Sequence, residues 1–134
     1  MSTPELLVLT GVFHLALLFA HGGYIALTFG VVWGTGRRNK PVVTSDLSRR
    51  FERTITNNIE SMAAFIPVTT GSLFLAAPMD WATLAATIYL SARVAFAALY
   101  LLNIPYLRTV AWIIGQLMIA VISLPLIYAV WPNY

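Results

Sequence analysis

Residues 6–33 read LLVLTGVFHLALLFAHGGYIALTFGVVW and contain no Asp, Glu, Lys or Arg. A helix needs about 20 apolar residues to cross a bilayer, and this stretch exceeds that length. It is also longer than the apolar core of a signal peptide, which has about 7–15 residues, and no basic segment precedes it. The stretch therefore predicts a transmembrane helix that is retained in the mature protein.

Three further apolar stretches follow, at about residues 49–77, 81–102 and 110–131. Each is long enough to span a bilayer. Lipid offers no hydrogen-bond partner to an open backbone, so each is expected to be helical. The links between the stretches are short, which favours antiparallel neighbours. We therefore predict an all-α integral membrane protein, an up-down bundle of four transmembrane helices in a single domain over residues 1–134.

The composition of the whole chain supports this class. The chain has 134 residues, of which 59% are hydrophobic and only 10% charged, and its mean hydropathy is +0.79. Soluble domains are about 25% charged, and so short a chain has too much surface to hide this many apolar residues. The composition excludes an ordinary cytosolic enzyme, a disordered tail and a nucleic-acid-binding module. The absence of cysteine excludes thiolate metal sites, and we expect no metal and no nucleic-acid partner.

Basic residues are concentrated in one part of the chain. Six of the eight Lys and Arg residues lie between residues 37 and 53, and Arg108 follows in the third loop. Loops rich in Lys and Arg remain in the cytoplasm. We therefore expect loops 34–48 and 103–108 to be cytoplasmic and both termini to lie on the opposite side. The minimal loops favour a bacterial inner membrane.

A polar stripe is predicted at the start of the second helix. Arg53, Asn57 and Glu60 are four and seven residues apart, so at about 100° per residue they share one face. Arg53 and Asn57 can be read as ordinary interfacial residues, because arginine snorkels to the membrane surface. Glu60 falls just inside the cytoplasmic edge, where a carboxylate needs a cation or must keep its proton.

The third predicted helix supplies a cation. Arg93 lies about 18 Å from the outer face at 1.5 Å per residue, and it shares a helix face with Phe96 and Tyr100. We expect Arg93 to point into the bundle toward Glu60. One interpretation is a buried ion pair that only fixes helix register. The other is a polar pocket, open to the cytoplasm, for an anionic or zwitterionic ligand.

Three more arginines lie at the expected cytoplasmic mouth of this pocket. Arg108 either sets the topology or caps the pocket, and Arg37 and Arg38 leave the first helix on the same side. Arginine is well suited to bidentate recognition of carboxylates.

The two histidines lie on one face of the first helix. His14 and His21 are seven residues apart, or about 10 Å along the axis, so they cannot share one metal ion. Hydrogen bonding to a neighbouring helix is the better interpretation than metal or haem ligation.

Two motifs carry a resemblance to a known family. Residues 53–67 read RTITNNIESMAAFIP, and residues 92–115 read ARVAFAALYLLNIPYLRTVAWIIG. The first has Arg, then Asn four and Glu seven residues later, followed by Phe-x-Pro. The second has Arg, a Tyr seven residues later, a turn with Pro and then Leu-Arg. Both resemble the MAPEG family, the membrane-associated proteins in eicosanoid and glutathione metabolism, and in particular a small bacterial member of the microsomal glutathione transferase type.

The resemblance implies a homotrimer with glutathione as co-substrate, bound between adjacent subunits near the cytoplasmic side. It implies that Arg53, Asn57 and Glu60 hold polar groups of glutathione. Arg93 would pair with Glu60 and the ligand, and Tyr100 would contact the ligand. A lipophilic small molecule would enter from the lipid bilayer.

The resemblance also assigns roles to the arginines of the mouth. Arg37 or Arg38 would meet a ligand carboxylate. Arg108 would be the catalytic residue that stabilises the glutathione thiolate, since a nearby cation favours the ionised thiol. The expected activity is that of a glutathione-dependent transferase or peroxidase.

A second functional hypothesis rests on departures from the family pattern. Active relatives often carry basic residues just before the Asn, where this chain has Thr54, Ile55 and Thr56. Phe96 stands where some relatives have Tyr or His, and Ser61 replaces an aromatic residue. These differences are compatible with a non-catalytic lipid-binding scaffold or an accessory subunit of a larger membrane complex. A transporter is disfavoured, because no broken helix or continuous polar path is visible.

Overall fold

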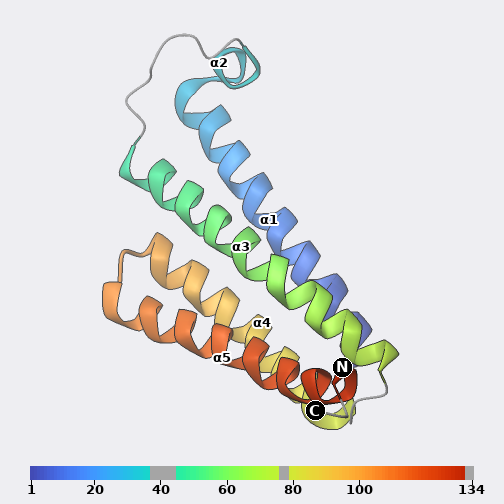
Figure 1. Ribbon diagram of the computed structural model, residues 1–134. Helices are drawn as coiled ribbons and strands as arrows, with labels where there is room; N and C mark the ends of the chain where they lie inside the picture. The colour runs from blue at the N-terminus through green and yellow to red at the C-terminus, as the bar shows by residue number, and fades with distance from the viewer. Residues whose placement is uncertain (37–44, 76–78, 132–134) are drawn as a thin grey trace.

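The structure, a computed structural model, describes residues 1–36, 45–75 and 79–131. All regular secondary structure in these residues is helical (Figure 1). The elements are α1 (Thr3–Phe29), α2 (Val31–Thr35), α3 (Asp46–Phe74), α4 (Met79–Leu101) and α5 (Pro105–Val130).

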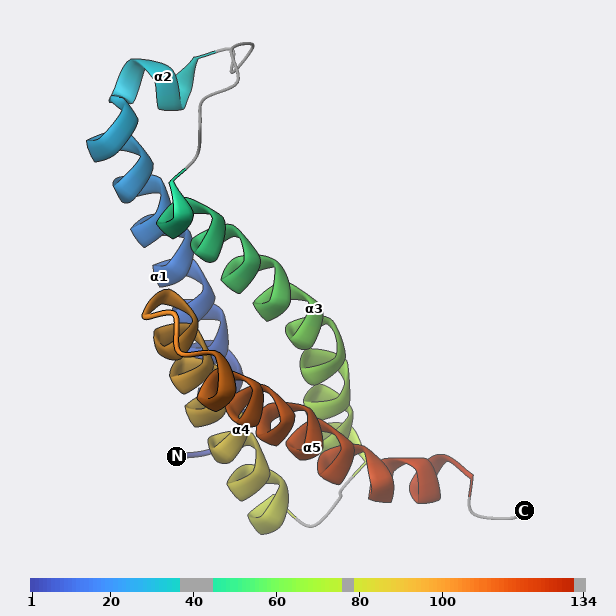
Figure 2. The same ribbon diagram turned by 90° about the vertical axis from the view of Figure 1, so that its left-hand side faces the viewer.

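The four long helices form two antiparallel pairs. α1 lies beside α3, and α4 packs most extensively against α5 (Figures 1 and 2). α3 joins the pairs, because it contacts α1, α4 and α5. The start of α1 and the start of α4 meet through a hydrogen bond of 2.7 Å between the Thr3 and Thr83 hydroxyls. Consecutive long helices therefore run up and down, as the short links predict.

The core lies where the four long helices meet. Leu6 of α1, Phe65 of α3, Tyr89 of α4 and Ile122 of α5 are each 1% exposed or less. The Phe65 and Tyr89 rings stack with their centroids 3.8 Å apart. Small residues of α4, Ala85 among them, let the helices approach closely around these large side chains.

The helix ends differ from the sequence expectation in ways that local chemistry explains. The sequence predicts a first helix that continues to residue 33, but the helix breaks at Gly30, whose φ of +86° is favourable only for glycine. α3 begins at Asp46 because the Ser45 hydroxyl accepts a hydrogen bond from the Ser48 amide at 3.1 Å. α5 begins at Pro105 instead of residue 110, since proline is preorganised for the first helical position.

Three of these helices are long and apolar enough to cross a membrane. They are residues Thr3–Phe29, Asp80–Leu101 and Pro105–Val130. α3 does not reach that hydropathy, because its first half carries several charged residues and two asparagines. Large apolar side chains on the spanning helices are exposed, Leu27 at 91% for example. An apolar outer surface of this extent fits contact with lipid rather than water.

Candidate functional site

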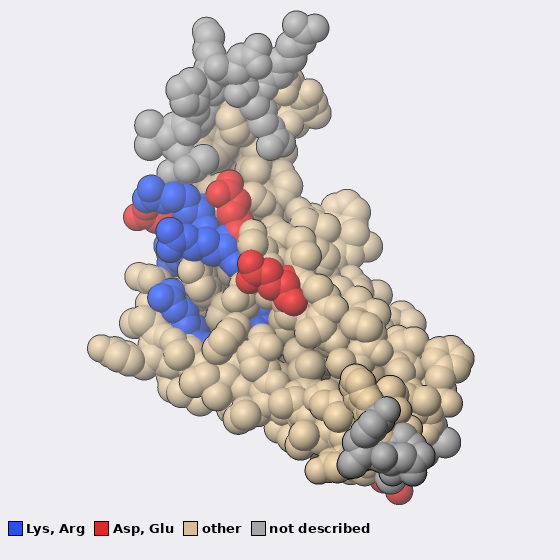
Figure 3. Space-filling view, viewed as in Figure 1, with Lys and Arg blue, Asp and Glu red and all other residues tan. Residues whose placement is uncertain are grey.

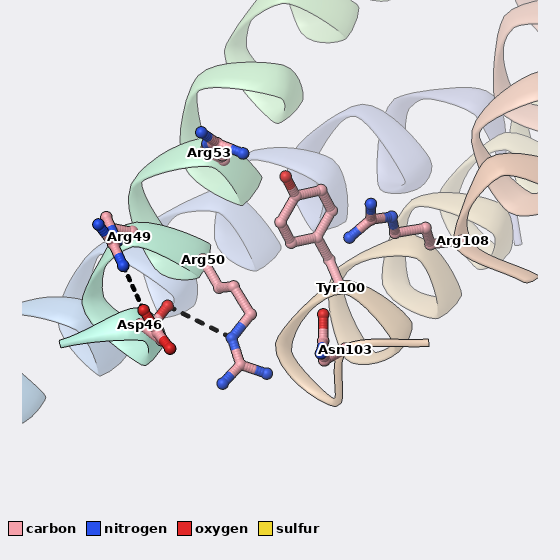
Figure 4. Close-up of a pocket in the computed structure, with 7 residues that line it drawn as sticks. All are labelled: Asp46, Arg49, Arg50, Arg53, Tyr100, Asn103 and Arg108. Carbon is pink, nitrogen blue, oxygen red and sulfur yellow. Dashed lines mark hydrogen bonds and ion pairs between the residues drawn. The ribbon is translucent and has the colours of Figure 1, made fainter. Parts of the chain in front are cut away.

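A polar pocket opens where the start of α3 faces the turn between α4 and α5 (Figure 4). Its volume is about 370 Å³. Arginines from the first turns of α3 form one wall, and the end of α4 and the start of α5 form the other. The lining residues are Asp46, Arg49, Arg50, Arg53, Tyr100, Asn103 and Arg108. We call this hollow the basic pocket.

Arg50 ties the two walls of the basic pocket together. Its Nη1 donates to the Leu101 carbonyl oxygen at 2.7 Å, and its Nε donates to the Asp46 carbonyl oxygen at 3.3 Å. The Leu101 carbonyl is at the C-terminus of α4, where a helix leaves carbonyls without an internal partner. The guanidinium of Arg50 is therefore held between the two helices, and its Nη2 donates to no other residue in the described part of the chain.

Arg108 and Tyr100 form a stacked pair in the opposite wall. The guanidinium carbon of Arg108 lies 4.4 Å from the centroid of the Tyr100 ring. Such cation–π contact orients the arginine without using its hydrogen-bond donors. Arg108 can therefore still donate to an anion in the pocket. In Figure 4 the Tyr100 hydroxyl points toward the α3 wall that carries Arg53.

The net charge of the basic pocket is strongly positive. Four arginines are opposed by one carboxylate, that of Asp46, which pairs with Arg49. Figure 3 shows these basic side chains gathered on one side of the molecule, with acidic side chains next to them. A concentration of arginine donors of this kind recognises carboxylate or phosphate groups.

A second hollow of about 430 Å³ adjoins the first. Arg53 and Tyr100 line both hollows. The remaining lining residues are Glu52, Thr56, Asn57 and Glu60. We call this hollow the acidic pocket, because two carboxylates face it. Together the two pockets offer cationic and anionic groups side by side, which suits a ligand that carries both charges.

Arg93 lies behind the acidic pocket and not in it. It is only 1% exposed. Its Nη2 donates to the Asn57 Oδ1 at 2.9 Å, and its Nε donates to the Asn58 Oδ1 at 3.3 Å. Asn57 also lines the acidic pocket, so it connects the buried guanidinium to the ligand space.

The expected pairing of Arg93 with Glu60 does not form in the structure. Among the described residues, no ion pair links them, and Glu60 is exposed. Two asparagine amides accept from two nitrogens of Arg93 instead, Nε and Nη2. Burying a carboxylate beside Arg93 would require removing both ions from water, which costs several kcal/mol per ion. Neutral amide oxygens accept from Nε and Nη2, Nη1 has no hydrogen-bond partner among the described residues, and Glu60 stays exposed.

The structure brings most of the predicted site residues together. Arg53 and Tyr100 line both pockets, Arg108 lines the basic pocket, and Asn57 and Glu60 line the acidic pocket. Arg37 and Arg38 lie outside the described residues.

Sequence reasoning missed a set of buried polar contacts next to this site. Asn58, only 2% exposed, donates from Nδ2 to His14 Nδ1 at 3.0 Å. Ser61 bonds the Tyr89 hydroxyl at 3.1 Å and accepts from Gln116 at 3.3 Å. The signal was present, because Asn58 and Ser61 are polar residues in a stretch predicted to span the membrane, and buried polar side chains need partners.

Both histidines of α1 hydrogen-bond to α3, which confirms the interhelical interpretation. His21 Nε2 lies 3.2 Å from the Ser48 hydroxyl, and its ring stacks on Phe51 at a centroid distance of 5.4 Å. Within the described ranges, no group of three or more His, Cys, Asp or Glu side chains is arranged to hold a metal ion.

Comparison with known families gives one match. The model of the MAPEG family matches residues 6–128, which is nearly the whole chain. No curated protein and no solved structure matches the chain significantly.

Proposed function

The chain belongs to the MAPEG family of membrane proteins in glutathione and eicosanoid metabolism, and on that premise we propose that it is a glutathione-dependent transferase or peroxidase. Its second substrate would be a lipophilic molecule that arrives through the lipid bilayer. Members of the family generally use glutathione, so the question for this chain is whether its own residues fit that peptide.

The adjoining basic and acidic pockets are the observation that carries the proposal. Glutathione has two carboxylates, one ammonium group and a thiol. Arg50 and Arg53 offer donors for a carboxylate, and Glu60 offers an acceptor for the ammonium group. Because Arg53 and Tyr100 line both pockets, one extended or bent peptide can contact both charge types at once.

Arg108 is the residue we assign to thiol activation. It is held over the Tyr100 ring and lines the basic pocket, so its charge would favour the thiolate over the thiol. In a transfer reaction the thiolate sulfur forms a bond to the electrophilic carbon of the second substrate. That carbon's leaving group departs with its electron pair, or the adduct takes up a proton.

The assembly and placement in the membrane are part of the same proposal. We propose a homotrimer in which a neighbouring subunit covers the open side of the two pockets. α3 would be the fourth membrane-spanning helix, with its charged first turns at the cytoplasmic edge. Loops 34–48 and 103–108 would be cytoplasmic and both termini would lie on the other side of a bacterial inner membrane. One domain would comprise residues 1–134.

Isothermal titration calorimetry with glutathione on the detergent-purified full chain tests the proposal. Saturable binding is expected, and Glu60→Gln should weaken it by about tenfold because one charged hydrogen bond is lost. Asp80→Asn is the matched control: it also neutralises an exposed carboxylate, but at the opposite end of α4. Absence of binding by folded protein, or equal weakening by both substitutions, would contradict the assigned site.

A non-catalytic role is the second candidate, favoured by the residues that precede Asn57. Thr54 and Ile55 are buried in the helix contacts, and Thr56 lines the acidic pocket without a charge. The acidic pocket thus has Arg53 as its only cation among its described lining residues. A lipid-binding scaffold or accessory subunit would show no thiol-dependent turnover of 1-chloro-2,4-dinitrobenzene and would co-purify with a lipid or a protein partner.

A further inference from the structure

Four side chains form a continuous stack that begins inside the bundle and ends in the basic pocket. The guanidinium carbon of Arg93 lies 4.7 Å from the centroid of the Phe96 ring. The rings of Phe96 and Tyr100 contact each other at a tilt, with their centroids 5.4 Å apart. The guanidinium carbon of Arg108 lies 4.4 Å from the centroid of the Tyr100 ring. We call these four residues the aromatic stack.

Helix geometry places the members of the aromatic stack. Arg93, Phe96 and Tyr100 follow one another at spacings of three and four residues in α4, so they share one face of that helix. Arg108 lies in the first turn of α5, which begins directly after the short turn that follows α4. Cations attract aromatic faces within about 6 Å, and tilted rings attract each other at centroid distances of about 4.5–7 Å. Each step of the stack is therefore a favourable contact.

The inner end of the aromatic stack is fixed by burial and by hydrogen bonds. Arg93 is 1% and Phe96 is 5% exposed. Arg93 donates to the side-chain oxygens of Asn57 and Asn58 at 2.9 and 3.3 Å. Side chains in such close-packed surroundings keep one rotamer on average. The Phe96 ring is therefore a rigid support for the half-buried Tyr100.

The outer end of the aromatic stack depends on the Tyr100 ring. In the described ranges of the chain, the Arg108 guanidinium makes no hydrogen bond and no ion pair. Ordering a long arginine side chain costs conformational entropy, so a guanidinium without such contacts samples several rotamers unless another group restricts it. The Tyr100 ring, which is itself in contact with Phe96, supplies that restriction.

Phe96 bears on the candidate site only through its neighbour in the stack. It is not among the residues that line the basic or the acidic pocket, and its ring has no polar group. Its contact with Tyr100 nevertheless determines how that ring lies beside Arg108. The phenylalanine at this position, a departure from the family pattern, is therefore compatible with a catalytic protein.

We propose that Phe96 is a positioning residue for Arg108: it holds the Tyr100 ring, and the ring holds the Arg108 guanidinium at the basic pocket before any ligand binds. The consequence for catalysis rests on the proposed glutathione function. A cation that is already in place stabilises the thiolate without reorganisation when the thiol proton leaves. A mobile arginine would be near the sulfur for only part of the time, and less thiolate would form.

Nuclear magnetic resonance of the ligand-free protein tests the positioning. The full chain is prepared in detergent with isotopically labelled arginine, and the Nε–H signal of Arg108 is assigned by its loss in Arg108→Lys. The order parameter of this bond, which reports picosecond-to-nanosecond motion, should be high in the wild type. Phe96→Leu should lower it to the value of Arg53, an exposed arginine whose side chain makes no hydrogen bond within the described residues.

A second measurement follows the thiol. The thiolate of bound glutathione is measured by its ultraviolet absorbance, and turnover is measured with 1-chloro-2,4-dinitrobenzene at saturating glutathione. Phe96→Leu should lower the thiolate fraction and the turnover by about two- to tenfold, the range expected for one lost aromatic contact. Because Phe96 is not among the lining residues of the pockets, the dissociation constant of glutathione should change by less than about twofold.

Three further variants make the test specific. Phe96→Tyr keeps the ring and should keep the order parameter and the turnover of the wild type. Phe65→Leu makes the same change at another buried phenylalanine, which stacks on Tyr89 in the core, and should leave the order of Arg108 and the turnover of the folded protein unchanged. Phe96→Met fills the space without a rigid ring and replaces Phe96→Leu if that variant does not fold.

The outcomes separate this proposal from the proposed function. An Arg108 side chain that is mobile in the ligand-free wild type, or equally ordered in Phe96→Leu, overturns the positioning role. An equal loss of order in Phe65→Leu overturns it as well. A wild type that forms no thiolate contradicts the glutathione function, while the order parameters still decide whether Phe96 positions Arg108.

Discussion

Replacing Asn58 with leucine is expected to lower the free energy of unfolding by about 3 kcal/mol. Leucine has the same branched shape and is larger, so the change removes hydrogen bonds and leaves no cavity. Arg93 loses the acceptor for its Nε, and His14 loses the donor to its Nδ1. A hydrogen bond to a charged group contributes about 1.5–3 kcal/mol and a neutral one about 1 kcal/mol.

The loss of stability should be large because Arg93 has few other hydrogen bonds. Its Nη1 is already buried without a hydrogen-bond partner among the described residues. After Asn58→Leu only Nη2 would keep one, the 2.9 Å bond to Asn57. Unfolding in detergent micelles, followed by tryptophan fluorescence against denaturant, measures the change. Ser91→Ala is the control: this exposed hydroxyl bonds only its own helix, and it should change the free energy of unfolding by less than about 0.5 kcal/mol.

A double-mutant cycle tests whether Asn58→Leu destabilises the protein by removing a hydrogen bond to Arg93. If the destabilisation arises from a buried guanidinium without an acceptor, Arg93→Leu in the Asn58→Leu background should lower the free energy of unfolding much less than Arg93→Leu alone. A coupling energy of about 2 kcal/mol between the two positions is expected. Additive effects, or a loss below about 1 kcal/mol for Asn58→Leu, would refute the reasoning.

Three further predictions concern other parts of the molecule. Arg108→Ala should abolish glutathione-dependent turnover while glutathione affinity, measured by calorimetry, falls less than tenfold; equal loss of both would argue against a thiolate role. Gly115→Leu should destabilise the bundle by about 1–3 kcal/mol, because even a Cβ at this position would lie 3.4 Å from the Arg93 Cδ, and thermal unfolding should show Gly115→Ala to be much milder. Gly30→Ala should cost about 1–2 kcal/mol, since alanine is strained at a φ of +86°, and an unchanged melting temperature would contradict a rigid break between α1 and α2.

The sequence predicts the long helices well, because hydropathy and length alone mark where a chain can enter lipid. It predicts less well where a helix stops. Nothing in the apolar run around Gly30 distinguishes a packing glycine from one with positive φ. Pro105 could have been recognised as a helix start, but the neighbouring tyrosine and arginine read as a loop.

The candidate site could likewise be predicted only in part. Helix periodicity places Arg53, Asn57 and Glu60 on one face, and the structure puts them along one pair of hollows. The partner of Arg93 could not be predicted, because Glu60 and the asparagines are all within reach on an ideal helix. The free energy needed to bury a carboxylate beside Arg93 favours the asparagines over Glu60. Arg50 was missed because its contact with the Leu101 carbonyl depends on how α3 and α4 pack.

The polar character of α3 has a consequence for how the protein is made. α1, α4 and α5 are apolar enough to partition into lipid as each leaves the ribosome, whereas α3 is not. Its place in the bundle therefore depends on helices synthesised before and after it. The hydrogen bonds of Asn58 and Ser48 with the two histidines of α1 can form early, but Arg93 reaches Asn57 and Asn58 only after α4 has emerged. Substitutions among these polar contacts of α3 should therefore reduce the yield of membrane-inserted protein during biosynthesis, in addition to any effect on the stability of the folded protein.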